Sequence, residues 1–488
     1  MTMTSEQRTG APEPPTAAVT TADTAEPTIE PTTATTAEPT TTTTAEPIAA
    51  TDAPTAADAT RGAAPAREPL GRPFAAALGA TGLANLGDGV VGVGAPLVAL
   101  TLTRSATQIA LLSAATWLPW LLLGMLAGVA VDRTDRRRTQ MVAMLARAAV
   151  LGVGMWLVVS GNLSMAWLVT VVLAYGVTEV FADIAQTSLV PDLVPRSRLQ
   201  AANGRVLAVQ QVANTFVGGP IAGAVLALGA AWVLGLPAGL ALGAAVLLWR
   251  GVRGNYRPAP APVTPGEGGE APAAPQTAVR RAAHEVRDGL SFLVRHPVLR
   301  PLVIAGSLMN MAFTAYFAVF VLWAVGPESR MGLPPSRYPL MLAALAVGAV
   351  LGSLVVERIV TALPELRVLV TASISTAAVL VVPILAPDAV AVAVTLFLAG
   401  FCTTIGNVVS ASMRQRMVPQ GMLGRVSGAS RTLGYGLMPV GAVLGGVVAD
   451  GWGLPAVFWS AAALSVAAAC YPATVLRQRT IDAAELRD

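Results

Sequence analysis

The sequence predicts an all-α integral membrane protein of about twelve transmembrane helices, arranged as two pseudo-symmetric six-helix bundles. The chain is 54% hydrophobic and only 12% charged, with a mean hydropathy of +0.62. A water-soluble chain could not bury that much apolar surface, whereas a lipid bilayer solvates it directly. The apolar residues also gather in runs of the length that crosses a bilayer, and a Pro/Gly/Ala-rich stretch at 256–277 divides these runs into two nearly equal halves.

Each apolar run of about twenty residues predicts one membrane span. We place the spans at residues 74–101, 106–130, 140–159, 164–188, 203–228, 230–249, 301–325, 339–356, 368–386, 389–410, 424–449 and 454–476. The long run from Val206 to Trp249 gives two spans only if the chain turns at Gly229–Trp232.

The segments around the spans differ in composition. The start of the chain holds hardly any large apolar side chain, so burial cannot repay the entropy of ordering it. The expected domains are a disordered Thr/Ala/Pro-rich cytoplasmic tail (1–70), an N-terminal bundle (71–250), a cytoplasmic linker with an amphipathic helix (251–298), a C-terminal bundle (299–478) and a C-terminal tail (479–488).

Arginine accounts for all of the basic side chains, because the sequence holds no lysine. With twelve alternating spans, the loops of one side carry Arg133, Arg136, Arg137, Arg138, Arg196, Arg198, Arg205, Arg358, Arg367, Arg414, Arg416 and Arg425. The loops of the other side carry Arg104, Arg330 and Arg337. The positive-inside rule makes the first side cytoplasmic and places both termini there, in the cytoplasmic membrane. The lack of lysine excludes a phosphate-binding P-loop, and so an ATP-driven pump encoded in this chain.

Glycines recur at one constant offset in the second and fourth spans of each half. The pairs are Gly124 with Gly348, Gly128 with Gly352, and Gly176 with Gly400. Such a repeat indicates two parallel six-helix units, the architecture of transporters whose substrate site lies between the halves near the bilayer midplane.

The loop after the second span concentrates charge, with six charged residues among the seven from Asp132 to Arg138. It resembles motif A of the major facilitator superfamily through Gly128, Asp132, Arg133, Arg136 and Arg137. Asp135 stands where the motif has a second glycine. The resemblance implies that the motif's Asp caps a neighbouring helix end and pairs with arginines across the cytoplasmic face, which closes that face in an outward-facing state. The alternative is a charged loop that only fixes topology.

Three further segments narrow this resemblance to the branch that exports drugs, macrolides and siderophores by proton antiport. They are "NLGDG" at 85–89, "LVPRSRLQAANG" at 193–204 and "GLSFLVRHPVLRPL" at 289–302. The resemblance covers the chain after about residue 70. We expect a monomer in the lipid bilayer that uses no cofactor, binds no nucleic acid, and has a small-molecule substrate and protons as its partners.

Ionisable groups at membrane depth are costly and usually functional. Asp88 and Asn85 share a face of the first span, and Glu179 and Asp183 are one turn apart in the fourth. Two nearby carboxylates cannot both ionise easily in a low dielectric, so one of them can exchange a proton during a transport cycle. These residues are therefore candidates for proton coupling or for holding a cationic substrate.

A structural role is the alternative for each carboxylate: helix packing for Asp88, and for Asp183 an ion pair with Arg205 or Arg147. The amides Gln211, Asn214, Asn310 and Asn407 are candidates to line the same cavity. Amides in membrane helices serve equally as interhelical hydrogen-bond partners.

Both histidines, His284 and His296, lie in or beside the stretch Val279–Arg295, whose helical spacing of apolar residues predicts an amphipathic helix on the cytoplasmic membrane surface. We interpret them as solvated loop residues, so no catalytic or metal constellation is expected in the bundles. The favoured function is proton-coupled efflux of a small hydrophobic or cationic compound, such as a drug, an antibiotic or a siderophore-like molecule, by alternating access. The alternatives are a nutrient or metabolite importer, which often carries more charged and aromatic pore residues, and an intramembrane enzyme, which would need a catalytic constellation.

Overall fold

The computed structural model describes residues 70–257, 284, 287–419 and 422–476, and these form helices joined by short connections. In the first half the elements are α1 (Arg72–Ala99), α2 (Ala106–Val131), α3 (Arg136–Val159), α4 (Met165–Leu193), the 3-10 turn η1 (Arg196–Arg198), α5 (Leu199–Gln211), the π-helical η2 (Val212–Gly218), α6 (Gly219–Leu228) and α7 (Ala230–Gly251). In the second half they are α9 (Leu299–Ala324), α10 (Tyr338–Ala362), α11 (Glu365–Val379), α12 (Val382–Leu385), α13 (Ala389–Met417), α14 (Leu423–Trp452) and α15 (Leu454–Val475).

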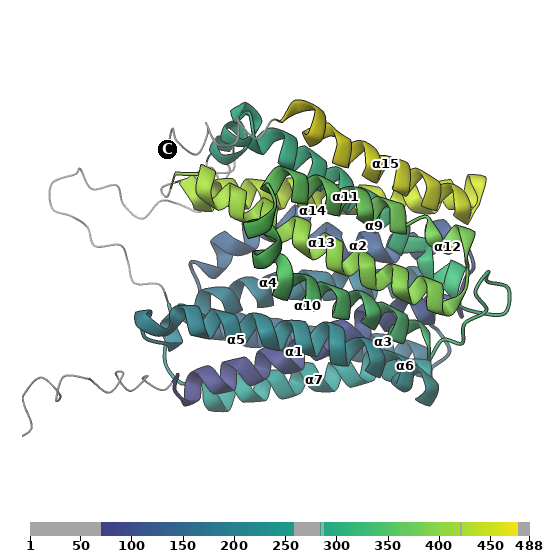
Figure 1. Cartoon of the computed structure of the whole chain (residues 1–488). Coiled ribbons are helices and arrows are strands. Elements are labelled where there is room, and N and C mark those ends of the chain that lie inside the picture. The colour runs from purple at the N-terminus through teal and green to yellow at the C-terminus, as the bar shows by residue number, and fades with distance from the viewer. Residues whose placement is uncertain (1–69, 258–283, 285–286, 420–421, 477–488) are drawn as a thin grey trace, which may run out of the picture. The chain divides into compact units, whose positions relative to one another are not determined.

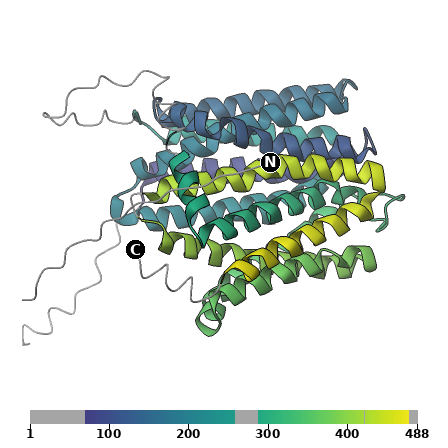
Figure 2. The ribbon, with the colours of Figure 1, turned by 90° about the horizontal axis from the view of Figure 1, so that it is seen from above.

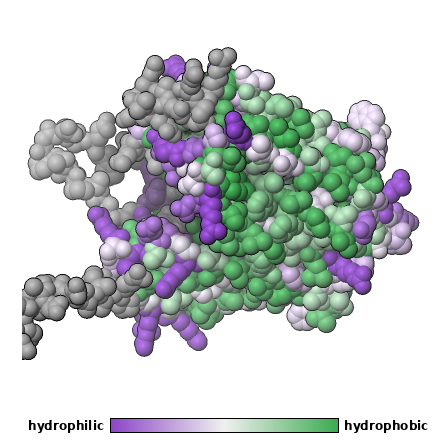
Figure 3. Space-filling model, in the orientation of Figure 1, coloured by the Kyte–Doolittle hydropathy of each residue, from purple (hydrophilic) through white to green (hydrophobic). Residues whose placement is uncertain are grey.

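Twelve spans in the described residues are long and apolar enough to cross a membrane, which confirms the predicted fold class. The fifth span runs through η1, α5, η2 and α6, and the ninth through α11 and α12. Figure 3 shows hydrophobic residues covering the middle of the visible face and hydrophilic residues gathered toward its two ends, as a bilayer requires. Several helices extend past their apolar runs; α13, for example, ends at Met417 rather than near residue 410.

Local sequence explains where the helices begin. The side chains of Ser105, Asp135, Ser164 and Asp388 accept hydrogen bonds from backbone N–H groups in the first turns of α2, α3, α4 and α13. The predicted turn between the fifth and sixth spans is confirmed at Gly229, whose φ of 131° suits glycine and few other residues.

The two groups of helices are packed side by side (Figures 1 and 2). We call residues 72–251 the N-half and residues 299–475 the C-half. In the N-half α3 packs on α4 and α7, and in the C-half α10 packs on α13 and α9 on α14 and α15. The halves contact each other through α2 with α14, α6 with α10, and α2 with α9.

The predicted repeat is clearest in the fourth span of each half. Both α4 and α13 have 29 residues, and their bounds are separated by the same offset as the glycine pairs. A Cβ on Gly176 would lie 3.0 Å from Pro119 of α2, and a Cβ on Gly400 would lie 2.0 Å from the Leu345 carbonyl oxygen of α10. Equivalent glycines thus sit at equivalent helix contacts.

The apolar cores differ between the two ends of the molecule. We call the end that carries Arg136, Arg196 and Arg414 the arginine-rich end. At the opposite end a single hydrophobic core joins both halves, and it includes Val98 and Ile109 of the N-half with Phe320 and Phe458 of the C-half. At the arginine-rich end each half has its own cores. The halves therefore meet at one end and keep separate cores at the other.

The segment between the halves is described only in part. Residues 287–295 are helical, and Leu293 of this helix is buried in the C-half core. His296 lies in the loop before α9, as predicted, but it is not fully solvated: the ring is half-buried and its Nδ1 accepts backbone hydrogen bonds from Val298 and Leu299 at the start of α9. The predictions for residues 1–69, most of the linker (258–283) and the C-terminal tail (477–488) lie outside the described residues.

Candidate transport site

A buried ion pair lies at the centre of the N-half. The Arg147 guanidinium of α3 donates to Oδ1 of Asp88 on α1, with Nη1 at 2.7 Å, and the two side chains are only 3% and 14% exposed. The Tyr175 hydroxyl of α4 donates to the same carboxylate oxygen. The guanidinium also lies over the Tyr175 ring, 4.7 Å from its centroid, and donates to the Thr178 hydroxyl at 3.4 Å. Three helices are tied together by one carboxylate.

Glu179 and Asp183 extend this group along α4. Both lie within the electrostatic reach of Asp88 and Arg147, and both are only partly accessible. Asp183 also interacts with Gln210 of α5 and with Arg431 of α14 in the other half. We call Asp88, Arg147, Tyr175, Glu179 and Asp183 the ionic cluster. The three carboxyl groups predicted from the sequence do come together in the structure.

Sequence reasoning missed two members of the ionic cluster. Arg147 was considered only as a partner of Asp183, yet its close contact is with Asp88. An arginine inside the apolar run of the third span is itself a signal of a buried partner. Tyr175 carries no such signal, because a tyrosine in a membrane helix is more often a packing residue.

The predicted amides divide into two groups. Asn85 donates to the Thr81 carbonyl oxygen of its own helix at 3.0 Å, and Gln211 donates to the Thr215 hydroxyl at 3.1 Å. The backbone of Asn214 packs against α1, where a Cβ on Gly89 would lie 2.0 Å from the Asn214 carbonyl oxygen. Asn85 and Gln211 therefore bond within their own segments, whereas the side chains of Asn310 and Asn407 face a cavity.

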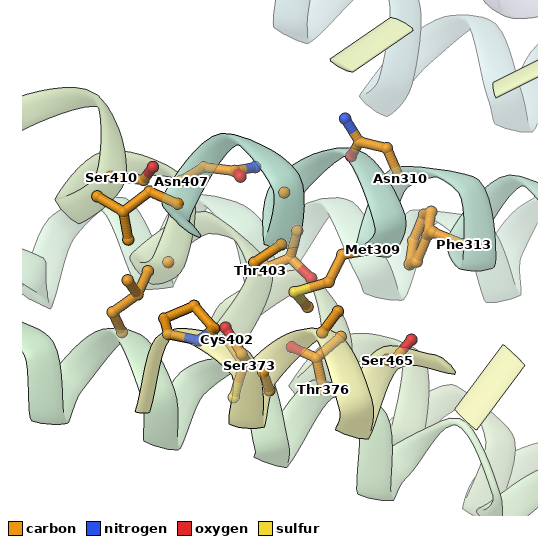
Figure 4. Close-up of a pocket in the computed structure, with 18 of the residues that line it drawn as sticks. Met309, Asn310, Phe313, Ser373, Thr376, Cys402, Thr403, Asn407, Ser410 and Ser465 are labelled. Atoms are coloured by element: carbon orange, nitrogen blue, oxygen red, sulfur yellow. The ribbon is translucent and has the colours of Figure 1, made fainter. Parts of the chain in front are cut away.

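Asn310 and Asn407 line a cavity of about 280 Å³ inside the C-half (Figure 4). Its walls come from α9, α11, α13, α14 and α15, and no charged side chain lines it. The polar lining residues are Asn310, Ser373, Thr376, Cys402, Thr403, Asn407, Ser410 and Ser465. The apolar lining includes Met309, Phe313 and Met438. We call this space the C-half cavity.

The repeat relates the two sites directly. At the offset of the glycine pairs, Thr403 is equivalent to Glu179 and Asn407 is equivalent to Asp183, on helices of equal length. Two positions that carry carboxylates in the N-half therefore carry an uncharged hydroxyl and an amide in the C-half. The same helix faces present ionic chemistry in one half and neutral hydrogen bonding in the other.

The residues that resemble motif A lie at the arginine-rich end. Arg136 pairs with Asp192 at the end of α4 at 2.6 Å, and Arg137 donates to the Leu248 and Trp249 carbonyl oxygens at the end of α7. Asp135, which replaces the motif's glycine, is buried and caps α3 through the Arg138 N–H.

Motif A also includes Gly128, in α2, and Asp132 and Arg133, which are exposed directly after it. Asp132 forms no ion pair within the part of the chain that the structure describes, and the contacts of Arg136 and Arg137 described above remain in the N-half. This agrees with the separate cores at this end, because an Asp132 that capped a C-half helix would join the halves here.

A carboxylate joins the halves at the opposite end. Asp450, at the end of α14, accepts hydrogen bonds from the Ala106 and Thr107 N–H groups at 2.9 and 3.0 Å and from the Ser105 hydroxyl at 3.0 Å. It therefore caps α2 from the other half. Beside it lies a contact made only of alanines: Ala110, Ala114, Ala318 and Ala442.

The chain is similar to known transport proteins along most of its length. It is 27% identical over 395 residues to the multidrug efflux pump Tap of Mycobacterium tuberculosis, with 78% of this chain and 87% of the relative covered. It is 28% identical over 378 residues to the MFS-type transporter y4rN of Sinorhizobium fredii, with 76% and 87% covered. A bacterial homologue of the human lysosomal transporter Spinster matches in fold, with a TM-score of 0.62 at 14% identity over 86% of this chain and 99% of that one. The nucleoside transporter NupG also gives a TM-score of 0.62, at 12% identity over 84% of this chain and 100% of that one.

The model of the Major Facilitator Superfamily matches residues 77–438 and 312–486, and so nearly all of both halves. The relatives of this chain are named as efflux pumps or transporters, so the alternative of an intramembrane enzyme is excluded. The chain belongs to the Major Facilitator Superfamily and is a multi-pass membrane transporter of small molecules.

Proposed function

We propose that the protein is a proton-coupled exporter of a small, hydrophobic or cationic compound, a drug, an antibiotic or a siderophore-like molecule. The observation that carries this proposal is the ionic cluster, in which three carboxyl groups share one guanidinium at membrane depth. Even with Arg431 near Asp183, full ionisation would leave one negative charge without compensation in a low dielectric, so the cluster favours binding of a proton.

The hydrogen bonds of the cluster suggest which group holds the proton. Asp88 already accepts hydrogen bonds from both Arg147 and Tyr175, which hold it in place. Glu179 lies on the same helix as Tyr175 and shares the guanidinium only at longer range. We infer that Asp88 anchors Arg147 and that Glu179, with Asp183, takes up and releases the proton.

Alternating access follows from the contacts between the halves. We propose that the arginine-rich end is cytoplasmic, by the positive-inside rule, and that both termini lie there. The separate cores at that end and the Asp450 contact at the other then describe a state closed to the outside. Asp132, Arg133 and their motif would close the cytoplasmic face in the opposite state, when Asp132 reaches a C-half helix.

The direction of transport is supported by the named relative, a multidrug efflux pump. An importer of a nutrient remains the second candidate, and the uncharged lining of the C-half cavity disfavours charged metabolites as its ligands.

Efflux from cells that contain a panel of neutral antibiotics and lipophilic cations tests the proposal. We expect wild-type cells to export at least one compound only while the proton gradient stands, and a protonophore should stop export. Asp88→Asn should abolish export against a gradient, because the Arg147 anchor is lost. The matched control is Glu357→Gln, an exposed carboxyl of α10, which should export as the wild type does.

Two results would contradict the proposal. Export that continues with a collapsed gradient would exclude proton coupling. Uptake driven by the gradient, with no export, would favour the importer.

A further inference from the structure

We infer that the C-half cavity is a binding site for the neutral part of the transported compound, an aromatic or aliphatic ring system that carries hydroxyl or amide groups. This inference rests on the proposed function in one respect, namely that the ligand of the cavity is the transported compound. It narrows the substrate class, because a site without charge favours an uncharged ring system over a lipophilic cation.

The size and lining of the cavity carry the first step. A space of about 280 Å³ is near the lower bound of ~300 Å³ for small-molecule sites, so it holds one ring system with a short polar arm. Met309, Phe313 and Met438 offer apolar and polarisable contact, while hydroxyls and amides are distributed around them. This combination matches small-molecule sites, which are mostly apolar with a few orienting polar groups.

An unused hydrogen-bonding group carries the second step. The Thr403 Oγ1 is buried and has no hydrogen-bond partner among the described residues. Most threonines of these helices donate to a carbonyl oxygen one turn earlier, as Thr376 and Thr395 do. Figure 4 shows the Thr403 hydroxyl in the middle of the lining, directed toward Met309. A buried polar group without a partner calls for an explanation, and a ligand that fills the cavity would supply the missing hydrogen bond.

The repeat carries the third step. In the N-half the equivalent positions hold Glu179 and Asp183, which belong to the ionic cluster. In the C-half the substitution by Thr403 and Asn407 removes both charges and keeps hydrogen-bonding capacity. The carboxyl pair then remains free for protons, and no negative charge faces the cargo in the C-half cavity.

The chain supplies its own reporter for a binding experiment. It has two cysteines: Cys402 lines the C-half cavity and Cys470 is exposed. In Cys470→Ser, modification of Cys402 by N-ethylmaleimide reports on occupancy of the cavity, read by mass spectrometry of the purified protein in detergent. The control is Cys402→Ser, in which Cys470 reports on general effects of an added compound.

Two neutral probes, chloramphenicol and the smaller acetanilide, are added at rising concentration. At least one should slow the modification of Cys402 and leave Cys470 unchanged. Thr403→Val, which keeps the shape and removes the hydroxyl, should raise the half-protecting concentration about fivefold through one lost hydrogen bond. Tetraphenylphosphonium should not protect, because no carboxylate lines the cavity.

The proposal is wrong if neither neutral probe slows the modification of Cys402, or if the cation protects as well as they do. Equilibrium binding of radiolabelled chloramphenicol to wild type and Thr403→Val gives a second readout that does not depend on thiol reactivity; equal affinities would also overturn the proposal. Neither measurement needs a proton gradient. Protection of Cys402 without gradient-driven export would therefore support the binding site and contradict the proton coupling. Gradient-driven export without protection would support the proton coupling and contradict the binding site.

Discussion

The fourth span of the N-half and the fourth span of the C-half have the same length and the same place in the repeat, yet their inner faces differ in charge. On α4 the residues Glu179 and Asp183 join Arg147 and Asp88 in a network of charges. On α13 the equivalent Thr403 and Asn407 line a cavity without charges. The repeat preserves the scaffold, whereas the chemistry of its two copies has diverged.

This difference suggests a division of labour between the halves. A site that must gain and lose a proton benefits from several ionisable groups close together, because each affects the charge of the others. A site that must accept and release apolar cargo benefits from having none, because no charge then loses water when the ligand enters. Placing the two on separate halves lets each be optimised independently.

The largest expected effect follows from removing the cation of the N-half. Arg147→Met should abolish export and lower the free energy of unfolding by about 3–5 kcal/mol, because the buried Asp88 loses its counter-ion and keeps only the Tyr175 hydrogen bond. The thermal unfolding midpoint in detergent and gradient-driven export measure the two effects. Arg358→Met, at an exposed arginine of the C-half, is the control. If the N-half charges form one unit, Asp88→Asn combined with Arg147→Met should recover stability and remain inactive.

A pair of variants at equivalent positions tests the division of labour. Glu179→Gln should abolish export against a gradient and leave binding of chloramphenicol intact. Thr403→Val should leave the gradient dependence intact and raise the apparent KM about fivefold. Binding and export are measured on both proteins. Should each variant impair both properties equally, the halves do not have separate roles.

The equivalent glycines should respond unequally. Gly400→Ala places its Cβ against the Leu345 backbone of α10 and should destabilise the protein by about 1–3 kcal/mol, because two helices must move apart. Gly176→Ala meets mainly the Pro119 ring and should have a smaller effect. Unfolding midpoints of the two variants give the comparison, and equal midpoints would mean that the close approach in the C-half is not required.

The smallest expected effect concerns the contact between the halves. Asp450→Ala removes the cap that α14 provides to α2 and should weaken the closed end by about 1 kcal/mol. Labelling of Ala110→Cys by a membrane-impermeant maleimide, in a protein without the two native cysteines, should then rise about fivefold. Asp388→Ala is the control, since Asp388 caps its own helix within the C-half. If labelling of Ala110→Cys is unchanged, Asp450 stabilises the start of α2 but not the contact between the halves.

The sequence predicted the fold well because hydropathy reports directly on membrane spans. It placed the turn at Gly229, and it singled out Asp88, Glu179 and Asp183, since charges are rare in apolar runs. The structure brings these three carboxyl groups together, and their role in proton coupling stays a prediction. It did not reveal the C-half cavity, because hydroxyls and amides occur throughout membrane helices and their convergence depends on tertiary packing. Asp450 was missed for a related reason: its partners are backbone groups at the start of α2, which lie in the other half of the chain.

The alanine contact at the closed end affects how easily the protein can change state. Ala110, Ala114, Ala318 and Ala442 have no side-chain rotamers, so their contact forms without freezing rotational freedom. Larger side chains would have to find one interlocking arrangement at every closure. The alanine contact can separate and close again in each cycle with little entropic penalty, so the cost of closing this end lies in the larger side chains of the core that joins the halves, such as Ile109 and Phe320.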